Sequence, residues 1–203
     1  MNKVLSCLLP AAAIALLSAT AAAAAPFNGP YVGAALGMDN YEIQANDFFY
    51  EGTNFDGLSA NGAVLSLYTG YDYAFGTKGF VGIEAALDLS GAELSVSDSD
   101  YAAKLKAKES YSLAGRLGGM INESTGLYGR LGWVNTKFKE TADDYADSGN
   151  ESGWLYGVGI ETALKTSTTL RAEYNIVDYG DVGPDNVLTA KNSQFKVGVS
   201  YRF

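Results

Sequence analysis

The ten C-terminal residues alternate between apolar and polar side chains without interruption. Phe195, Val197, Val199, Tyr201 and Phe203 take one parity, and the polar or small residues between them take the other. Because successive side chains of an extended strand point to opposite faces, this pattern predicts a two-faced β-strand. The apolar face ends on an aromatic residue at the C-terminus, where soluble chains usually fray. The pattern therefore indicates a strand whose apolar face meets lipid.

Seven further segments show the same alternation. They cover residues 29–38, 62–73, 80–89, 109–121, 126–136, 153–164 and 168–179. In the clearest of them, Val81 and Ile83 alternate with Gly82 and Glu84. The length of each segment is close to the ~9–11 residues that a tilted strand needs to cross a bilayer. It exceeds the ~5–6 residues that are typical of strands in soluble proteins. We expect eight membrane-crossing strands with their apolar parity outward.

The connections between these segments alternate in length. The long ones cover residues 39–61, 90–108, 137–152 and 180–192, and the short ones residues 75–79, 122–125 and 165–167. An even strand count with short turns at one end and long loops at the other is typical of outer-membrane barrels. We therefore predict an all-β fold, an eight-stranded antiparallel up-and-down transmembrane β-barrel. Since open sheet edges are not tolerated in lipid, the last strand should close against the first, near Val32.

The N-terminus has the pattern of a secretory signal. Lys3 precedes an apolar stretch over residues 4–17 and an alanine run with small residues at the cleavage spacing. A cut after Ala24, which keeps Pro26 away from the cleavage point, predicts a signal peptide over residues 1–24 and a barrel domain over residues 25–203. The single cysteine, Cys7, lies in this signal, so the mature chain should contain neither a disulfide nor a reactive thiol.

Ten charged residues take the polar parity of their strands. They are Asp72, Glu84, Asp88, Arg116, Arg130, Glu161, Arg171, Glu173, Lys196 and Arg202. A lipid-facing Arg or Lys near the bilayer midplane costs about 2–4 kcal/mol, so these side chains should point into the lumen.

Counting from the short turns places six of these residues at a similar depth. They are Glu84, Arg116, Arg130, Glu161, Arg171 and Glu173. Because an eight-stranded barrel is just wide enough for its own side chains, three arginines and three glutamates at one level predict a charge cluster that plugs the lumen. We favour an electrostatic core that holds the strands together, since unpaired buried charge is costly.

Four groups of residues carry a resemblance to a known family. They are residues 31–37, residues 79–84, residues 130–133 with 170–174, and residues 199–203. With them the chain resembles the small eight-stranded outer-membrane barrels of the OmpA transmembrane-domain and OmpX-like porin family. The resemblance covers the mature chain except for the long connections. It implies a second interpretation of the charge cluster, a gated ion path in which the ion pairs exchange partners.

The same resemblance gives the C-terminal strand a role. It implies that Phe195, Val197, Val199, Tyr201 and Phe203 form the signal read by the outer-membrane assembly machinery. OmpA itself continues into a periplasmic domain that grips peptidoglycan, whereas this sequence stops at Phe203. No peptidoglycan anchor is therefore expected.

The amino-acid composition argues against several classes of function. The sequence contains no histidine, and with Cys7 in the signal the usual base-activated nucleophiles are missing, so we expect no catalytic residues and no enzyme activity. Zinc and haem ligands are equally scarce, so we expect no metal site and no cofactor. The formal net charge is −9, which argues against nucleic acid as a partner, because its phosphate backbone is bound by positive charge.

The long connections are candidate contact surfaces. The first holds Asp39, Glu42, Asp47, Glu51 and Asp56, and the third holds Glu140, Asp143, Asp144, Asp147 and Glu151. We expect solvated acidic loops, with divalent cations bridging to lipopolysaccharide as the alternative. Residues 48–50, Phe-Phe-Tyr, form either an exposed contact patch for an extracellular ligand or a cover for the barrel rim.

Together these patterns predict an integral outer-membrane surface protein. Its role would be structural or surface-interactive, with at most a narrow, charge-plugged ion path. The alternatives are a small porin and, from another class, a secreted lipocalin-like barrel with the apolar parity inward. The expected partners are outer-membrane lipid, lipopolysaccharide, the outer-membrane assembly machinery and an extracellular ligand at the long loops.

Overall fold

The computed structural model describes residues 27–46, 54–98, 101–142, 145–165, 167–182 and 188–203, so the predicted signal peptide lies outside the described residues. Within these ranges the regular structure consists of nine strands. They are β1 (Gly29–Asn46), β2 (Asn54–Phe75), β3 (Gly79–Ser90), β4 (Glu93–Asp98), β5 (Tyr101–Met120), β6 (Thr125–Ala142), β7 (Tyr145–Lys165), β8 (Thr168–Val182) and β9 (Leu188–Arg202). The described residues include no helix that is long and apolar enough to cross a membrane.

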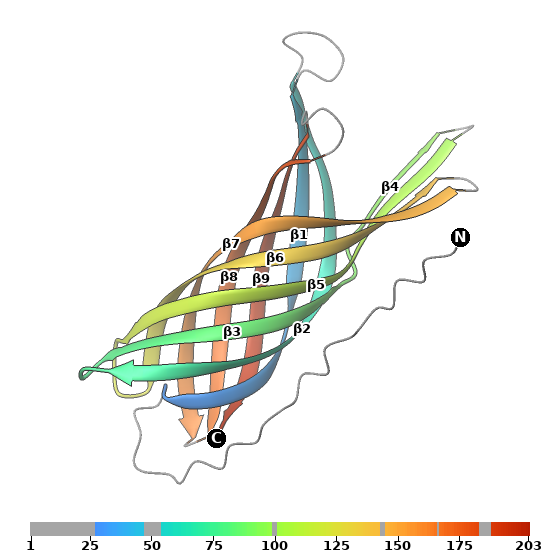
Figure 1. Ribbon diagram of the computed structural model, residues 1–203. Helices are drawn as coiled ribbons and strands as arrows, with labels where there is room; N and C mark the ends of the chain where they lie inside the picture. The colour runs from blue at the N-terminus through green and yellow to red at the C-terminus, as the bar shows by residue number, and fades with distance from the viewer. Residues whose placement is uncertain (1–26, 47–53, 99–100, 143–144, 166, 183–187) are drawn as a thin grey trace, which may run out of the picture.

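The strands form one closed antiparallel sheet (Figure 1). β3 and β4 lie end to end along the same edge of β5, so the nine strands make an eight-stranded barrel. β1 closes the barrel against β9, with Val32 opposite Tyr201. The predicted fold class and the predicted closure of the last strand on the first are both confirmed.

The two faces of the barrel wall have opposite character. Outward aliphatic side chains are exposed, as Leu36 (68%) and Leu117 (62%) illustrate, whereas the residues between them are mostly buried in the lumen. The predicted parity of the strands is therefore confirmed, and it is opposite to what the lipocalin-like alternative requires. The outward apolar belt gives way to polar residues toward the long hairpins, at Asn40 on β1, Lys137 on β6 and Asp178 on β8.

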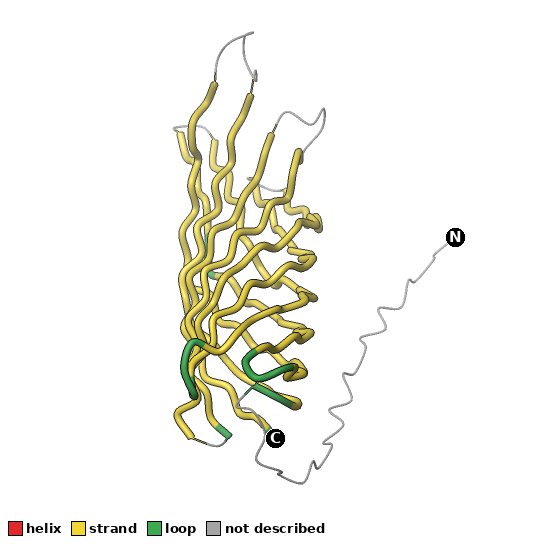
Figure 2. Tube along the Cα trace, turned by 90° about the vertical axis from the view of Figure 1, so that its left-hand side faces the viewer, coloured by secondary structure: helices red, strands yellow, loops and turns green. Residues whose placement is uncertain are grey.

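The short turns lie at the end of the barrel where the C-terminus is found (Figures 1 and 2). In the turn between β5 and β6, the side-chain Oδ1 of Asn122 accepts hydrogen bonds from the backbone N–H groups of Ser124 (2.9 Å) and Thr125 (2.8 Å). In the turn between β2 and β3, Gly76 has a φ of 57°, which glycine adopts without steric cost. These local signals fix the turns, and with them the strand register at this end.

The long connections are largely strand, which corrects the sequence prediction. β1 continues to Asn46 and β2 begins at Asn54, while β6 and β7 pair as far as Ala142 and Tyr145. Above the apolar belt water wets both faces of a hairpin, so no alternation of apolar and polar residues is required there. The periodicity that reveals the lower strands therefore fades, although the backbone pairing continues.

The barrel wall is continuous only at the level of the belt. β7 begins to pair with β8 at Trp154 and Asp178, and β2 begins to pair with β3 at Val64 and Ser90. Just above Val64 one backbone hydrogen bond, from the N–H of Gly91 to the carbonyl oxygen of Ala63 (2.9 Å), still joins the two sides. Beyond it the strands form two ribbons, β8-β9-β1-β2 and β4-β5-β6-β7, which diverge in Figure 1. Two seams therefore open the wall above the membrane.

Candidate functional site: the charged lumen

The structure buries all ten of the charged residues assigned to the polar parity. Five are acids and five are bases, so their formal charges cancel. The six residues placed at one depth from the sequence are among them, and all six belong to a single network of ion pairs. They come from β3, β5, β6, β7 and β8, so the network spans the lumen.

Glu84 on β3 is the centre of this network. Its carboxylate lies 3.0 Å from the guanidinium of Arg130 and 2.6 Å from that of Arg171. The hydroxyl of Tyr31 on β1 donates a third hydrogen bond to it, at 2.8 Å. A carboxylate with this many charged and neutral donors is well compensated for its loss of water.

Glu173 on β8 shares the same two arginines. Its carboxylate lies 2.9 Å from Arg130 and 3.5 Å from Arg171. The hydroxyl of Tyr128 donates to its other oxygen at 2.5 Å. Two carboxylates, two guanidinium groups and the phenols of Tyr31 and Tyr128 thus form a compact unit in the middle of the lumen.

Arg116 on β5 links this unit to a second one nearer the short turns. Its guanidinium lies 2.7 Å from Glu161 and 3.5 Å from Glu84. Its Nε lies 3.4 Å from Asp72. Arg116 therefore joins three carboxylates that come from three different strands.

Two members of the lower unit were not included in the predicted six. Arg202 on β9 lies 2.7 Å from Asp72 and 3.0 Å from Glu161. Asp72 lies three residues above the end of β2, so the same depth count could have placed it in the cluster. Arg202 is one residue from the C-terminus, and only the reach of its long side chain brings its charge to this level.

Aromatic rings complete the contacts of the arginines. The guanidinium carbon of Arg171 lies 3.4 Å from the centre of the Tyr68 ring, and that of Arg116 lies 4.1 Å from the centre of the Tyr128 ring. These are cation–π contacts. Below them Phe27 and Phe80 pack with ring centres 5.1 Å apart. The end of the lumen near the short turns is therefore filled by rings as well as by ion pairs.

The upper lumen is less charged. Lys196 pairs with Asp88 at 3.0 Å, and Ser66 donates a short hydrogen bond to the same carboxylate. Asp39, predicted to lie in a solvated acidic loop, is instead a buried residue of β1. The reason is that β1 continues past the belt and Asp39 keeps the inward parity. Glu42 and Glu151 are exposed strand residues, and the side chains of the other predicted loop acids, like residues 48–50, lie outside the described part.

The proposed assembly residues lie together on the outer face of β9. Phe195, Val197, Val199, Tyr201 and Phe203 are each about half exposed. The rings of Tyr201 and Phe203 pack edge to face, with centres 5.1 Å apart. The inward Lys196 and Arg202 belong to the charged network, so the two faces of this strand have separate environments.

The described residues contain no group of three or more histidine, cysteine, aspartate or glutamate residues arranged to hold a metal ion. In the charged network every carboxylate faces arginine or lysine, so none is free to act as a base. What the network can do chemically is to bind its own strands to one another across the lumen.

Residues 9–203 match the family model described as outer membrane protein beta-barrel domain. The chain belongs to this family. Its place in the cell is the outer membrane, and the lipid-facing belt described above is the surface by which it is embedded there.

Relatives with known names agree with this assignment. Outer membrane protein A of Serratia marcescens is 33% identical over 95% of this chain, although the match covers 55% of that relative, so the chain spans about half of its length. The 31 kDa outer-membrane immunogenic protein of Brucella melitensis is 27% identical over 72% of this chain and 68% of the relative.

A solved structure shows the same fold. Neisserial surface protein A superposes with a TM-score of 0.54 and 15% identity, over 87% of this chain and 98% of that structure. At this identity the similarity concerns the fold alone.

Proposed function

We propose that this protein is a structural and surface-interacting barrel whose lumen is closed to solutes by the charged network. The observation that carries the proposal is the pairing of all ten charged residues named above, with Glu84, Arg116, Arg130, Glu161, Arg171 and Glu173 at its centre. Eight strands leave space for little more than their own side chains, and here large charged and aromatic side chains fill that space.

The surface role is supported by the hairpins. Strand pairing continues well above the apolar belt, so the protein presents ordered polar ribbons on the outer side of the membrane. Lys106 with Glu93 and Lys137 with Glu109 form ion pairs on these ribbons. The name of the Brucella relative, an immunogenic protein, is consistent with such a surface. An extracellular ligand would be met by these ribbons.

We also propose that the protein has no enzymatic activity. A hydrolase built on this barrel would need an activated nucleophile or a free general base. The sequence has no histidine and a single cysteine, Cys7, and the five carboxylates of the charged network are engaged in ion pairs. Residues 1–24 are proposed to be removed as a signal peptide, which an N-terminal sequence of the mature protein beginning at Ala25 would verify.

Single-channel recording of the refolded barrel in a planar bilayer tests the closed lumen. We expect no steady openings for the unmodified protein. Arg171→Ala should introduce conductance, because it removes the side chain that bonds to both Glu84 and Glu173. Lys137→Ala, on a hairpin above the belt, is the control and should remain silent. Steady openings of the unmodified protein would refute the closed lumen and identify a small porin.

A further inference from the structure

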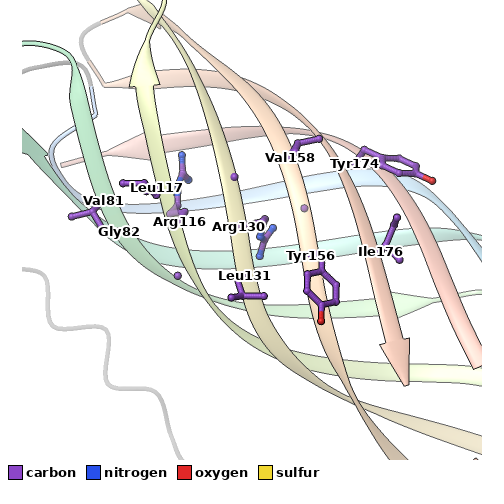
Figure 3. A pocket seen from close by; sticks show the side chains of 13 residues that line it. Val81, Gly82, Arg116, Leu117, Arg130, Leu131, Tyr156, Val158, Tyr174 and Ile176 are labelled. Atoms are coloured by element: carbon purple, nitrogen blue, oxygen red, sulfur yellow. The ribbon is translucent and has the colours of Figure 1, made fainter. Parts of the chain in front are cut away.

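The outer wall carries an apolar groove that the charged lumen does not explain. It has a volume of about 760 Å³ and crosses β3, β5, β6, β7 and β8 (Figure 3). One row of outward residues runs along it from strand to strand, in the order Val81, Leu117, Gly129, Val158 and Tyr174. In the neighbouring row Gly115 lies opposite Leu131.

Two of the outward positions that line the groove are glycines, Gly115 and Gly129. A Cβ atom added at Gly115 or Gly129 would meet no atom closer than 3.9 Å. Inward glycines differ, since a Cβ at Gly132 or Gly159 would lie 2.4 Å or less from a neighbouring atom. Glycine weakens a strand interior and often marks a place where another molecule approaches closely. Packing within the barrel therefore does not account for Gly115 and Gly129.

The floor and walls of the groove are suited to hydrocarbon. Arg116 and Arg130 contribute to its lining, but their side chains turn inward to the lumen carboxylates, so the floor is main chain. The walls are formed by Leu117, Leu131 and Tyr156, which Figure 3 labels on three neighbouring strands. These outward side chains belong to the belt that faces the membrane.

The short turns of outer-membrane barrels face the periplasm, so the groove, which lies near these turns, reaches the periplasmic half of the membrane. Gly129 is four residues above Thr125, the start of β6, which corresponds to roughly 10 Å of height in an apolar band of about 25 Å. Its lower end at Val81 is three residues from Lys78 in the exposed turn between β2 and β3. Among the described residues no ion pair involves Lys78. A cation thus lies at the level of the lipid headgroups, below the groove.

We propose that this groove binds one acyl chain of an inner-leaflet phospholipid, with Lys78 close to the headgroup phosphate. The groove crosses five strands, which extend over about 19 Å at the usual strand spacing, a length that suits a single flexible chain lying over Gly115 and Gly129. A second barrel would approach with a convex wall, which would bridge the groove without filling it. The proposal rests on the lipid-facing belt and holds whether or not the lumen conducts.

Photochemical labelling tests the proposal. The refolded protein is placed in vesicles of phosphatidylethanolamine and phosphatidylglycerol that contain a phospholipid with a photoreactive acyl chain, and the labelled residues are mapped by mass spectrometry. Labelling at Leu117 and Leu131 should exceed labelling at Leu36, on the belt but outside the groove, by severalfold. Filling the groove with Gly115→Leu and Gly129→Leu should abolish this excess. Ala34→Leu, an exposed alanine on β1, is the matched control and should leave it unchanged.

Two further measurements make the result decisive. Gly129→Ala adds a methyl group that meets only the carbonyl oxygen of Gly157, at 3.9 Å, so it should fold normally and lower the excess partially even if the double-leucine variant fails to fold. Lys78→Ala should also lower the excess of labelling at Leu117 and Leu131 over labelling at Leu36. Labelling that is even around the belt would overturn the proposal. So would disulfide-linked dimers of Gly129→Cys, made with Cys7 removed, since they would show a second copy in the groove.

Discussion

At the scale of single residues, the lumen depends on side chains that each satisfy several partners. Glu84 accepts from two arginines and a tyrosine, and Arg171 serves both Glu84 and Glu173 while its guanidinium stacks on Tyr68. Burying a charge costs several kcal/mol unless its partners replace water. Because the partners are shared, the loss of one residue leaves more than one charge undercompensated.

Arg171→Ala should therefore destabilise the barrel by about 3–5 kcal/mol, the usual cost of removing one partner from a buried ion pair. Urea unfolding of the protein in lipid vesicles measures this free energy. Lys137→Ala removes one partner of the half-exposed Lys137–Glu109 pair and should cost less than about 1 kcal/mol. Equal effects of the two substitutions would contradict a buried, cooperative network.

Tyr128→Phe isolates the contribution of one hydroxyl. The variant keeps the ring beneath Arg116 but loses the hydrogen bond to Glu173, so we expect a loss of about 1–3 kcal/mol in the free energy of unfolding. Tyr156→Phe, on the lipid-facing wall, is the control and should have a smaller effect. A loss for Tyr128→Phe no greater than that of the control would show that the hydroxyl contributes little.

At the scale of the element, β9 combines two roles on its two faces. The outward row from Phe195 to Phe203 lies in the lipid belt, while Lys196 and Arg202 pair with acids in the lumen. β9 also closes the barrel by pairing with both β1 and β8. We infer that its outward row is the part of the chain that the assembly machinery reads.

Phe203→Asp should impair insertion into the outer membrane, because it places a charge at the end of the proposed assembly signal. The fraction of protein recovered in the outer-membrane pellet measures this effect. Phe75→Asp is a matched control, since Phe75 is exposed to a similar extent (45% against 43%) at the short-turn end of β2. If the two variants insert equally well, the terminal aromatic is not a specific signal.

The sequence predicted the belt well and the region above it poorly, for one physical reason. Lipid on one side and a narrow lumen on the other force the strict alternation seen in residues such as Val81, Gly82, Ile83 and Glu84. Above the belt both faces are wet, so nothing in residues 39–46 distinguishes a strand from a loop. The individual partners of Glu84 could not be predicted either. Strand parity gives the direction in which a side chain points and its approximate depth in the barrel, but not the rotamer that decides which neighbour it contacts.

At the scale of the whole molecule, the structure is a closed barrel that divides into two ribbons. The closed part holds the charged network, and every strand there pairs with a neighbour on both sides. Above it each ribbon has two edge strands that pair on one side only. Local opening occurs most easily where backbone hydrogen bonds are exposed to water. The two parts should therefore differ in dynamics although both are strand.

Hydrogen exchange in lipid nanodiscs should show this difference within a single strand. Amides of residues 65–72 in β2 lie between β1 and β3 and should exchange more slowly than amides of residues 58–61, which lie in the ribbon and pair with β1 alone. Mass spectrometry of overlapping peptides resolves the two groups. Uniform protection along the strand would mean that the ribbons are as firmly held as the barrel.

The two seams also limit the membranes in which this protein can reside. At Trp154 with Asp178 and at Val64 with Ser90, strand pairing between the two ribbons ends near the height at which the outward residues become polar. Backbone groups along the open edges above these points depend on water for their hydrogen bonds. In a thicker bilayer those edges would enter hydrocarbon, where each unsatisfied group costs several kcal/mol. The height of the closed wall therefore sets an upper limit on hydrophobic thickness, and a thicker bilayer would have to thin around the protein.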